Sequence, residues 1–277
     1  NIIIGNGSNE ILELAARAFL NPDTSSIASK HAFAVYKIVT QSAGASMIEV
    51  PTCNWGHDLN SFADHLENNT RVIFIANPNN PTGTYNSHDE VHSLLKKVPS
   101  SVLVVLDCAY FEYVTKEDYV KPIDLLSEFD NLLITKTFSK IHGLASIRVG
   151  YGIAHPTLIE VFNRIRQPFN VNTLAQAMAA VAINDHEHIH QSIELNSQQY
   201  DFLFDQLSKL GLECIPSVGN FITFKGNFIG KEMFNNLMKK GVIVRSVDLY
   251  DMKDFIRVTI GTEAENLKFL NALKELL

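Results

Sequence analysis

Apolar segments of strand length alternate with amphipathic helical segments from the start of the chain to about residue 185. Arg71–Ala76 and Val102–Leu106 are the clearest of the predicted strands, and both are apolar almost throughout. Continuous apolar runs separated by helices are typical of parallel strands that helices cover on both faces. The sequence therefore predicts an α/β fold, with a mainly parallel sheet flanked by helices.

The chain changes character after about residue 210, where shorter strands alternate with further helices. This pattern predicts a small α+β domain, reached through a long polar helix that ends near Leu210. We therefore expect a large domain over residues 1–188 and a small C-terminal domain over residues 189–277. The chain opens directly on the apolar run Asn1-Ile2-Ile3-Ile4-Gly5, so we also expect that an N-terminal segment is missing. The predicted strands of the small domain are Phe221–Phe224, Val242–Val244 and Phe255–Thr259, and its predicted helices are Gly230–Lys240 and Glu263–Leu277.

Composition narrows the possible function classes. The 277 residues are 46% apolar and 19% charged, a balance typical of a globular protein with a sizeable core. The net charge of −7 argues against nucleic-acid binding. Three widely spaced cysteines do not form a disulfide framework, and no apolar run reaches the length of a membrane span. A reducing cytoplasm is the expected compartment, and neither nucleic acid nor a membrane is an expected partner.

A polar segment follows the predicted strand Asn131–Lys136. Ligands of open α/β sheets bind beyond the carboxyl ends of the strands, which is where this segment begins. Lys140 is a candidate amine nucleophile, and Thr137, Ser139 and Arg148 could hold an anion beside it. An amine next to an anion site suits pyridoxal phosphate, whose aldehyde forms a Schiff base and whose phosphate needs a cradle. A polar loop with a surface lysine explains the same residues equally well.

Polar side chains also follow two other predicted strands. The buried strand Val102–Leu106 leads into Asp107, where a carboxylate is costly unless a cation or a donor meets it. A protonated pyridine nitrogen is such a cation, and Tyr110 could donate to the phenolic oxygen of the same ring. A carboxylate that caps a neighbouring turn is the plainer alternative. Asn80 lies in the loop Asn77-Pro78-Asn79-Asn80-Pro81-Thr82-Gly83, whose prolines and glycine favour one rigid turn that could hold Asn80 against a ligand oxygen.

Weaker signals lie nearer the N-terminus. Free N–H groups at the start of the first helix, around Gly7, Ser8 and Asn9, could bind a phosphate. Ser8 or Asn9 could instead be an ordinary helix cap. Phe33 could lie against a flat heteroaromatic ring or simply in the core.

The remaining candidates are charged or imidazole side chains. Arg245 and Arg257 each lie at a predicted strand of the small domain and could bind a carboxylate or a phosphate, although surface ion pairs are the commoner role of arginine. His88 and His92 are one helical turn apart, but we interpret them as solvated surface residues. The run Asp185-His186-Glu187-His188-Ile189-His190 is interpreted as an exposed helix start, so no metal site is expected.

Taken together, these segments resemble the fold-type I pyridoxal-phosphate aminotransferases, and most closely the histidinol-phosphate aminotransferases among them. The resemblance covers essentially the whole chain, and the combination is specific although no single segment is. It implies the fold-type I architecture, which has a large domain with a mainly parallel sheet plus a small α+β domain, and it implies a homodimer with shared sites. The matching segments are Asn77-Pro78-Asn79-Asn80-Pro81-Thr82-Gly83, Thr137-Phe138-Ser139-Lys140, Gly143-Leu144-Ala145, Arg148-Val149-Gly150-Tyr151 and Arg257-Val258-Thr259-Ile260-Gly261-Thr262.

The resemblance also implies roles for the residues around the cofactor, pyridoxal 5'-phosphate. Lys140 would form the Schiff base and then move a proton between the substrate Cα and C4′ of the cofactor. Asp107 would pair with the pyridine nitrogen, and Phe33 would stack on the ring. Asn80 and Tyr110 would hold its phenolic oxygen. The residues implied around the cofactor phosphate are Gly7, Ser8, Asn9, Thr137, Ser139 and Arg148.

The implied reaction transfers an amino group between histidinol phosphate and 2-oxoglutarate, a step of histidine biosynthesis. Arg257, with Arg245, would bind the anionic end of the substrate, and two guanidinium groups suit a phosphate dianion better than one. An aromatic-amino-acid aminotransferase and a threonine-phosphate decarboxylase are alternatives on the same fold. A non-catalytic binding or regulatory domain is a further alternative, because a fold does not determine a function.

Overall fold

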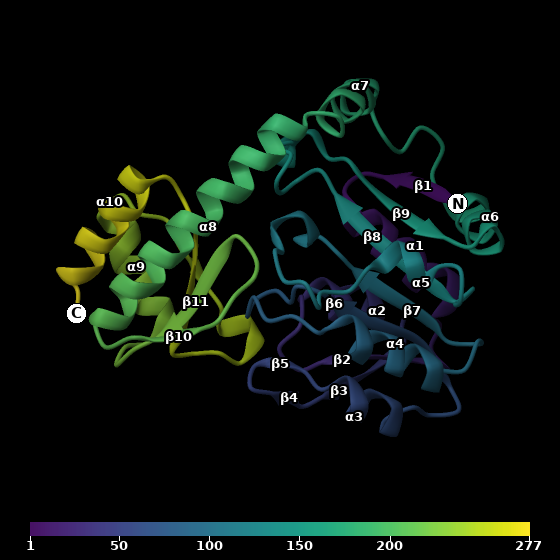
Figure 1. The fold of residues 1–277 in the computed structure, drawn as a ribbon. Helices are drawn as coiled ribbons and strands as arrows, with labels where there is room; N and C mark the ends of the chain where they lie inside the picture. The colour runs from purple at the N-terminus through teal and green to yellow at the C-terminus, as the bar shows by residue number, and fades with distance from the viewer.

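The computed structural model describes residues 1–277 as a large α/β part and a smaller α+β part joined by one long helix (Figure 1). The large part contains a seven-stranded sheet in the order β1-β9-β8-β7-β6-β2-β3. The five strands from β3 to β8 in this order run parallel, and only β9 runs antiparallel to its neighbours β8 and β1, so the predicted mainly parallel sheet is confirmed. The strands are β1 (Ile2–Gly5), β2 (Ser25–Ser29), β3 (Ser46–Val50), β6 (Thr70–Ala76), β7 (Leu103–Asp107), β8 (Leu132–Thr137) and β9 (Gly150–Ala154).

Helices cover both faces of this sheet because successive strand side chains point to opposite sides and both sides are apolar. In β6, Val72 and Phe74 pack with one set of helices, and Ile73 and Ile75 pack with the other. The first set comprises α1 (Ser8–Phe19), α2 (Val35–Ser42) and α6 (Pro156–Ile165). The second set comprises α3 (Leu59–Asp64), α4 (His88–Lys97) and α5 (Pro122–Leu125).

A long helix, α8 (His186–Lys209), follows α7 (Thr173–Ala182) and runs diagonally to the small domain (Figure 1). Its Leu203 and Leu207 are fully buried in the core of the small domain. The boundary that we predicted between residues 188 and 189 falls in the first turn of α8 and stays a prediction. The small domain has a four-stranded antiparallel sheet, β10 (Glu213–Ile215), β11 (Phe221–Lys225), β13 (Phe255–Thr259) and β12 (Arg245–Ser246), with helices α9 (Gly230–Lys239) and α10 (Glu263–Lys274).

One predicted strand of the small domain is wrong. Val242–Val244 forms no strand, and β12 begins only at Arg245. The N–H of Val242 donates to the carbonyl of Leu237, which closes the end of α9 after Gly241 at φ +73°. The apolar run is therefore a connection that follows the helix end, with Ile243 81% exposed.

Other strand limits also differ from the prediction. The sequence pattern of residues 147–154 predicts a further strand, but this strand, β9, begins only at Gly150, because Ala145–Ile147 forms a 3-10 turn (η2) and Arg148 has φ +62°. Further elements that the pattern did not predict are β1, β10 and a two-residue hairpin of β4 (Thr52–Cys53) and β5 (Gly56–His57), together with the 3-10 turns η1 (Phe111–Tyr113) and η3 (Asp248–Tyr250).

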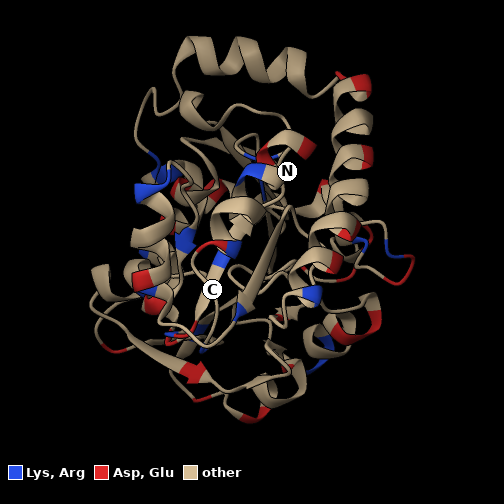
Figure 2. Ribbon diagram, turned by 90° about the vertical axis from the view of Figure 1, so that its left-hand side faces the viewer, with Lys and Arg blue, Asp and Glu red and all other residues tan.

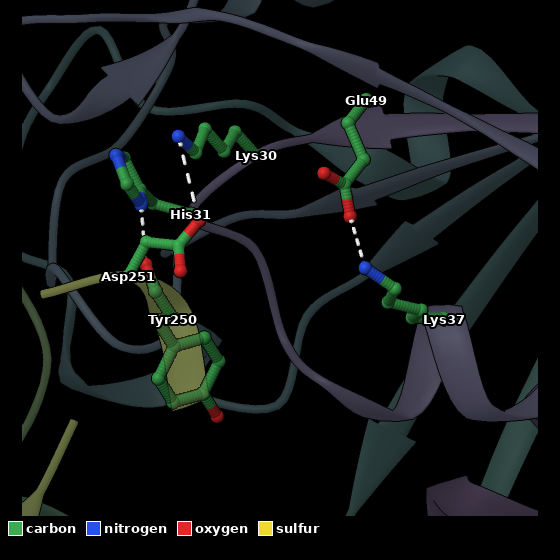
Figure 3. A network of polar contacts seen from close by, with 6 residues as sticks. All are labelled: Lys30, His31, Lys37, Glu49, Tyr250 and Asp251. Carbon is green, nitrogen blue, oxygen red and sulfur yellow. Dashed lines mark hydrogen bonds and ion pairs between the residues drawn. The ribbon is translucent and has the colours of Figure 1, made fainter. Parts of the chain in front are cut away.

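The loop after β2 contacts the small domain directly (Figure 3). His31 Nδ1 donates to the backbone carbonyl of Tyr250 over 2.7 Å, and the Lys30 ammonium lies 3.4 Å from the Asp251 carboxylate. A second link joins the N–H of Val218 to the carbonyl of Gly83 over 2.9 Å. These contacts bring the small-domain strands against the carboxyl edge of the large sheet.

Acidic and basic residues are interspersed along the ribbon of both domains (Figure 2). Helix α7 is the exception, since it has no charged residue. None of the helices combines the length and the apolar character that a membrane crossing needs.

Candidate active site

A cavity of about 220 Å³ lies beyond the carboxyl ends of β6, β7 and β8. Its position follows from the topology, because the chain passes from β3 at one side of β2 to β6 at the other, and ligands of α/β sheets bind at such a switch point. Ten of the eleven residues that the sequence predicts around a cofactor line this cavity. They are Ser8, Asn9, Phe33, Asn80, Asp107, Tyr110, Thr137, Ser139, Lys140 and Arg148, and the other lining residues are Ala76, Pro78 and Ala109.

Asp107, the last residue of β7, is only 4% exposed. Its Oδ1 accepts a hydrogen bond from the Thr135 hydroxyl over 2.9 Å, and its Oδ2 accepts one from the Tyr36 hydroxyl over 3.0 Å. Burial raises the pKa of the Asp107 carboxyl, and the donors from Thr135 and Tyr36 oppose that rise in part. A buried carboxylate at the wall of a cavity is suited to a cationic group of a ligand.

Sequence analysis missed both hydroxyl donors to Asp107. Thr135 is opposite Asp107 in the parallel pairing of β8 with β7, and no linear pattern indicates that register. A weak signal exists for Tyr36, because it follows Phe33, a predicted cofactor-binding residue, by only three residues. Two polar strand positions, Thr135 and Thr137, also share one face of β8.

Lys140 lies in the loop after β8 and lines the cavity. Its ammonium is 5.1 Å from the centre of the Tyr110 ring. The Tyr110 ring meets Phe221 of the small domain edge-on, with the ring centres 5.2 Å apart. The residue predicted to be the amine nucleophile and the one predicted to hold a ring oxygen therefore share one wall.

The start of α1 and the segment around Arg148 form a cradle at one end of the cavity. Helix α1 begins after Gly7 without any side-chain cap, so its first N–H groups are free to bind an anion. Gly7 has φ +80°, and a Cβ there would lie 2.4 Å from Arg148 Nη2. Arg148 also donates through Nη1 to the Ser139 hydroxyl over 3.3 Å. Glycine at position 7 thus leaves room for the guanidinium, and the cradle suits a phosphate.

The predicted substrate arginines lie beside the cavity rather than in its wall. Arg257 donates through Nη1 to the side-chain oxygen of Asn80, and its guanidinium lies 4.8 Å from the centre of the Phe221 ring. Arg245 is exposed and lies opposite Arg257 in the antiparallel register of β12 and β13. Asn80 is therefore fixed from the small-domain side, and its side-chain nitrogen stays free to donate into the cavity.

His57 is a buried polar residue that contacts Ala76, one of the residues that line the cavity. The His57 ring is 5% exposed, with Nε2 2.8 Å from the carbonyl of Ala76 and Nδ1 2.7 Å from the Ser29 hydroxyl. A carbonyl only accepts, so Nε2 carries the hydrogen and Nδ1 accepts from Ser29. Burial lowers the pKa of His57 to about 4, so the ring is neutral near neutral pH.

The histidine-rich segments make local contacts in the structure. The rings of His88 and His92 stack with their centres 5.9 Å apart, and His92 pairs with Glu128 over 3.1 Å. Asp185 caps α8 by accepting from the N–H of His188, which confirms the predicted helix start. The structure contains no group of three or more His, Cys, Asp or Glu side chains placed to bind a metal ion.

Comparison with known proteins gives consistent results. Residues 1–273 match the family described as aminotransferase class I and II. Over 276 residues, the chain is 50% identical to histidinol-phosphate aminotransferase of Methylobacillus flagellatus, a match that covers 100% of this chain and 74% of that protein.

Solved structures share the fold. The crystal structure of a protein from Erwinia carotovora atroseptica, described as a putative histidinol-phosphate aminotransferase, superposes with a TM-score of 0.93 at 25% identity, covering 99% of this chain and 80% of that one. Histidinol-phosphate aminotransferase from Sinorhizobium meliloti, solved in complex with pyridoxal-5'-phosphate, superposes with a TM-score of 0.92 at 24% identity, covering 100% and 77%. The fold-type I architecture predicted from the sequence is thereby confirmed.

Proposed function

The chain belongs to the class I and II aminotransferases, and on this premise we propose that it transfers an amino group between histidinol phosphate and 2-oxoglutarate with pyridoxal phosphate as its cofactor. The observation that carries the proposal is one cavity that combines the amine of Lys140, the buried carboxylate of Asp107 and an anion cradle. The 50% identity to a histidinol-phosphate aminotransferase over the whole chain supports this substrate above the aromatic-amino-acid and threonine-phosphate alternatives.

The residues of the cavity fit pyridoxal phosphate at each of its polar ends. The free N–H groups of α1, with Arg148 above Gly7, suit the phosphate. The buried Asp107 carboxylate suits the pyridine nitrogen, because a protonated ring nitrogen supplies the cation that a buried carboxylate needs. Asn80 and Tyr110 suit the phenolic oxygen as donors. Phe33 lines the same cavity and suits the face of the ring.

In the proposed reaction, Lys140 provides the nucleophilic amine and later the base. When bound, the cofactor supplies an aldehyde for Schiff-base formation and a ring that withdraws electrons from the substrate carbon. With the cofactor bound, the Lys140 amine would act as the base that moves a proton between the substrate Cα and C4′ of the cofactor. Asp107 would pair as a carboxylate with the ring nitrogen and favour its protonated form, which would strengthen the electron withdrawal.

Arg257 and Arg245 are proposed to bind the anionic end of each substrate. Arg257 is next to the cavity through Asn80, and Arg245 extends the positive charge outward. Histidinol phosphate carries a phosphate dianion at the position where glutamate carries a carboxylate. A pair of guanidinium groups can meet the dianion with more hydrogen bonds than one group can.

We also propose that the protein acts as a homodimer in the cytoplasm. Support for the dimer comes from α7, which has no charged residue and exposes Leu174 and Val181 to 73% and 72%. Phe169, which precedes α7, is 97% exposed, and Ile2 of the edge strand is 61% exposed. Large exposed apolar side chains grouped in this way mark an interaction surface. Sedimentation equilibrium tests the proposal, and a monomeric cofactor-loaded protein contradicts it.

The function is tested by half-reactions of the cofactor-loaded protein. Histidinol phosphate alone should convert the absorbance of the bound cofactor to that of its amine form, and 2-oxoglutarate should restore it. Phenylalanine and threonine phosphate serve as the comparison donors. Conversion by phenylalanine without conversion by histidinol phosphate contradicts the proposed substrate, and no conversion by any donor contradicts an aminotransferase. Borohydride reduction followed by peptide mapping should label Lys140.

A further inference from the structure

Two hydroxyl groups hold the Asp107 carboxylate, and the proposed reaction does not use either of them directly. Tyr36 reaches Oδ2 from α2, and Thr135 reaches Oδ1 from β8. Both Tyr36 and Thr135 have 0% exposure, and Asp107 has 4%. Because this carboxylate is almost fully buried, its charge depends on nearby donors and cations, which are these two hydroxyls, the N–H of Ala109 and the ammonium of Lys140.

Aromatic packing fixes the Tyr36 hydroxyl in place. The Tyr36 ring stacks on Phe74 of β6, with the ring centres 4.9 Å apart and an angle of 7°. Phe33, which lines the cavity, meets Tyr36 edge-on at 5.8 Å and 90°. These two contacts restrain the ring in the orientation that directs its hydroxyl at the Asp107 carboxylate. Tyr36 thus touches two of the residues that are proposed to contact the cofactor ring.

We propose that Tyr36 and Thr135 are positioning residues that keep Asp107 ionised and thereby keep the proton on the pyridine nitrogen of the bound cofactor. The inference rests on the proposed function, because it takes Asp107 as the partner of that nitrogen. A proton shared between a carboxylate and a pyridine nitrogen resides on the stronger base. Hydrogen bonds donated to the carboxylate stabilise its charged form and weaken it as a base.

The protonation of Tyr36 itself is consistent with this role. Burial and the charge of Asp107 raise the pKa of the Tyr36 hydroxyl well above its usual value, so the group keeps its proton and acts as a donor. Removing one hydrogen bond to a charged group typically shifts a proton equilibrium roughly ten- to hundredfold. Each of the two hydroxyls is therefore expected to affect the position of the proton on its own.

The experiment locates the proton directly in the cofactor-loaded protein. Pyridoxal phosphate labelled with ¹⁵N in the ring is bound to the wild type, to Tyr36→Phe and to Thr135→Val, and the nitrogen resonance is measured. The wild type should give the resonance of a protonated pyridine. Both variants should move toward the unprotonated value, and the apoprotein of each should bind the cofactor roughly tenfold or more weakly.

Matched variants separate positioning from mere packing. Thr135→Ser keeps the hydroxyl and should restore the wild-type resonance. Tyr85→Phe removes another tyrosine-to-aspartate bond, the 2.9 Å contact with Asp118 outside the cavity, and should leave the resonance unchanged. A structural role alone would lower the stability of Tyr36→Phe without moving the nitrogen resonance.

Each outcome decides the inference. If the nitrogen resonance of Tyr36→Phe equals that of the wild type, the proposed role of Tyr36 is wrong, even if the variant is less stable. If that variant does not fold, the comparison of Thr135→Val with Thr135→Ser decides in the same way for the carboxylate donors. An unprotonated nitrogen in the wild type, or no cofactor binding there, overturns both the inference and the proposed function. If the wild type gives the resonance of a protonated nitrogen and Tyr36→Phe and Thr135→Val give the same resonance, the inference is overturned but the proposed function is not.

Discussion

Arg245 and Arg257 are directly opposite each other on the antiparallel strands β12 and β13. Opposed residues of an antiparallel pair have their Cβ atoms about 5 Å apart and project from the same face of the sheet, so like charges there repel. Arg257 is also tied to Asn80 at the edge of the cavity. An anion between the two guanidinium groups would relieve the repulsion, which favours a doubly charged substrate group.

This arrangement predicts that the two arginines differ in selectivity. Arg245→Ala should raise the KM for histidinol phosphate roughly tenfold and the KM for glutamate less, because the outer guanidinium adds contacts that a dianion uses better. Arg257→Ala should raise both KM values, since it is the arginine tied to the cavity. Steady-state kinetics with both donors measures the difference.

Lys231→Ala is the charge-matched control, because it removes an exposed cation of α9 in the same domain. It should change neither KM. Equal effects of Arg245→Ala on the two donors would contradict selectivity for the phosphate.

Lys140→Ala should fold normally but lose turnover. The loop side chain contributes little to the core, whereas the reaction needs its amine both for cofactor attachment and for proton transfer. Circular dichroism and thermal unfolding check the fold, and a coupled assay with histidinol phosphate and 2-oxoglutarate checks the activity. Turnover close to that of the wild type would show that another residue provides the amine.

Gly7→Ala should weaken cofactor binding. The new Cβ would lie 2.4 Å from Arg148 Nη2, so the guanidinium must move away from the phosphate cradle. We expect at least roughly a tenfold rise in the dissociation constant, in line with the loss of a charged hydrogen bond. Fluorescence titration of the apoprotein with pyridoxal phosphate measures it.

Gly211→Ala is the matched control for the backbone. Gly211 also has a positive φ, +76°, but no atom lies within 4 Å of its Cβ position. Both variants should lose about 1–2 kcal/mol of stability from the left-handed conformation. Only Gly7→Ala should bind the cofactor more weakly. An equal loss of cofactor affinity in both variants would contradict the steric explanation.

His57 should make the protein less stable in acid. Its pKa is lowered from 6.5 to about 4 in the folded state, so the folded protein holds the neutral ring. The contribution of the neutral ring to stability is complete above pH 6.5 and is lost progressively as the pH falls from 6.5 to about 4. In this range the unfolded chain binds a proton at His57 and the folded protein does not. Its size is on the order of 3 kcal/mol.

Urea unfolding between about pH 7 and pH 4 measures this effect. His57→Gln should flatten the acid side of the stability profile, whereas His190→Gln, on the exposed surface of α8, should leave the profile unchanged. Identical profiles of His57→Gln and the wild type would mean that His57 titrates normally.

Most of the fold could be predicted because the strand and helix periods are local properties of the chain. Arg71–Ala76 and Val102–Leu106 were placed within one or two residues of β6 and β7. The prediction failed at Val242–Val244, where β-branched residues suggest a strand but the N–H of Val242 closes α9. An apolar run does not reveal which partner its backbone will find.

The candidate site could be predicted to the extent that polar residues follow strands. Asp107 ends β7 and Lys140 follows β8 in a sheet whose carboxyl edge is shared, so the two side chains meet because of the topology. Tyr36 was missed because it lies inside an ordinary amphipathic helix, where an aromatic residue usually belongs to the core.

By itself, the sequence determined the order of the elements, the residue types at the strand ends and the glycine that the cradle requires. Only the tertiary structure decided which of these side chains touch. Tyr36 meets Asp107 across 71 positions of the chain, and Arg257 meets Asn80 across 177. Periodicity depends on near neighbours, whereas such contacts depend on strand register, helix packing and the approach of the two domains, which form only when the whole chain is folded.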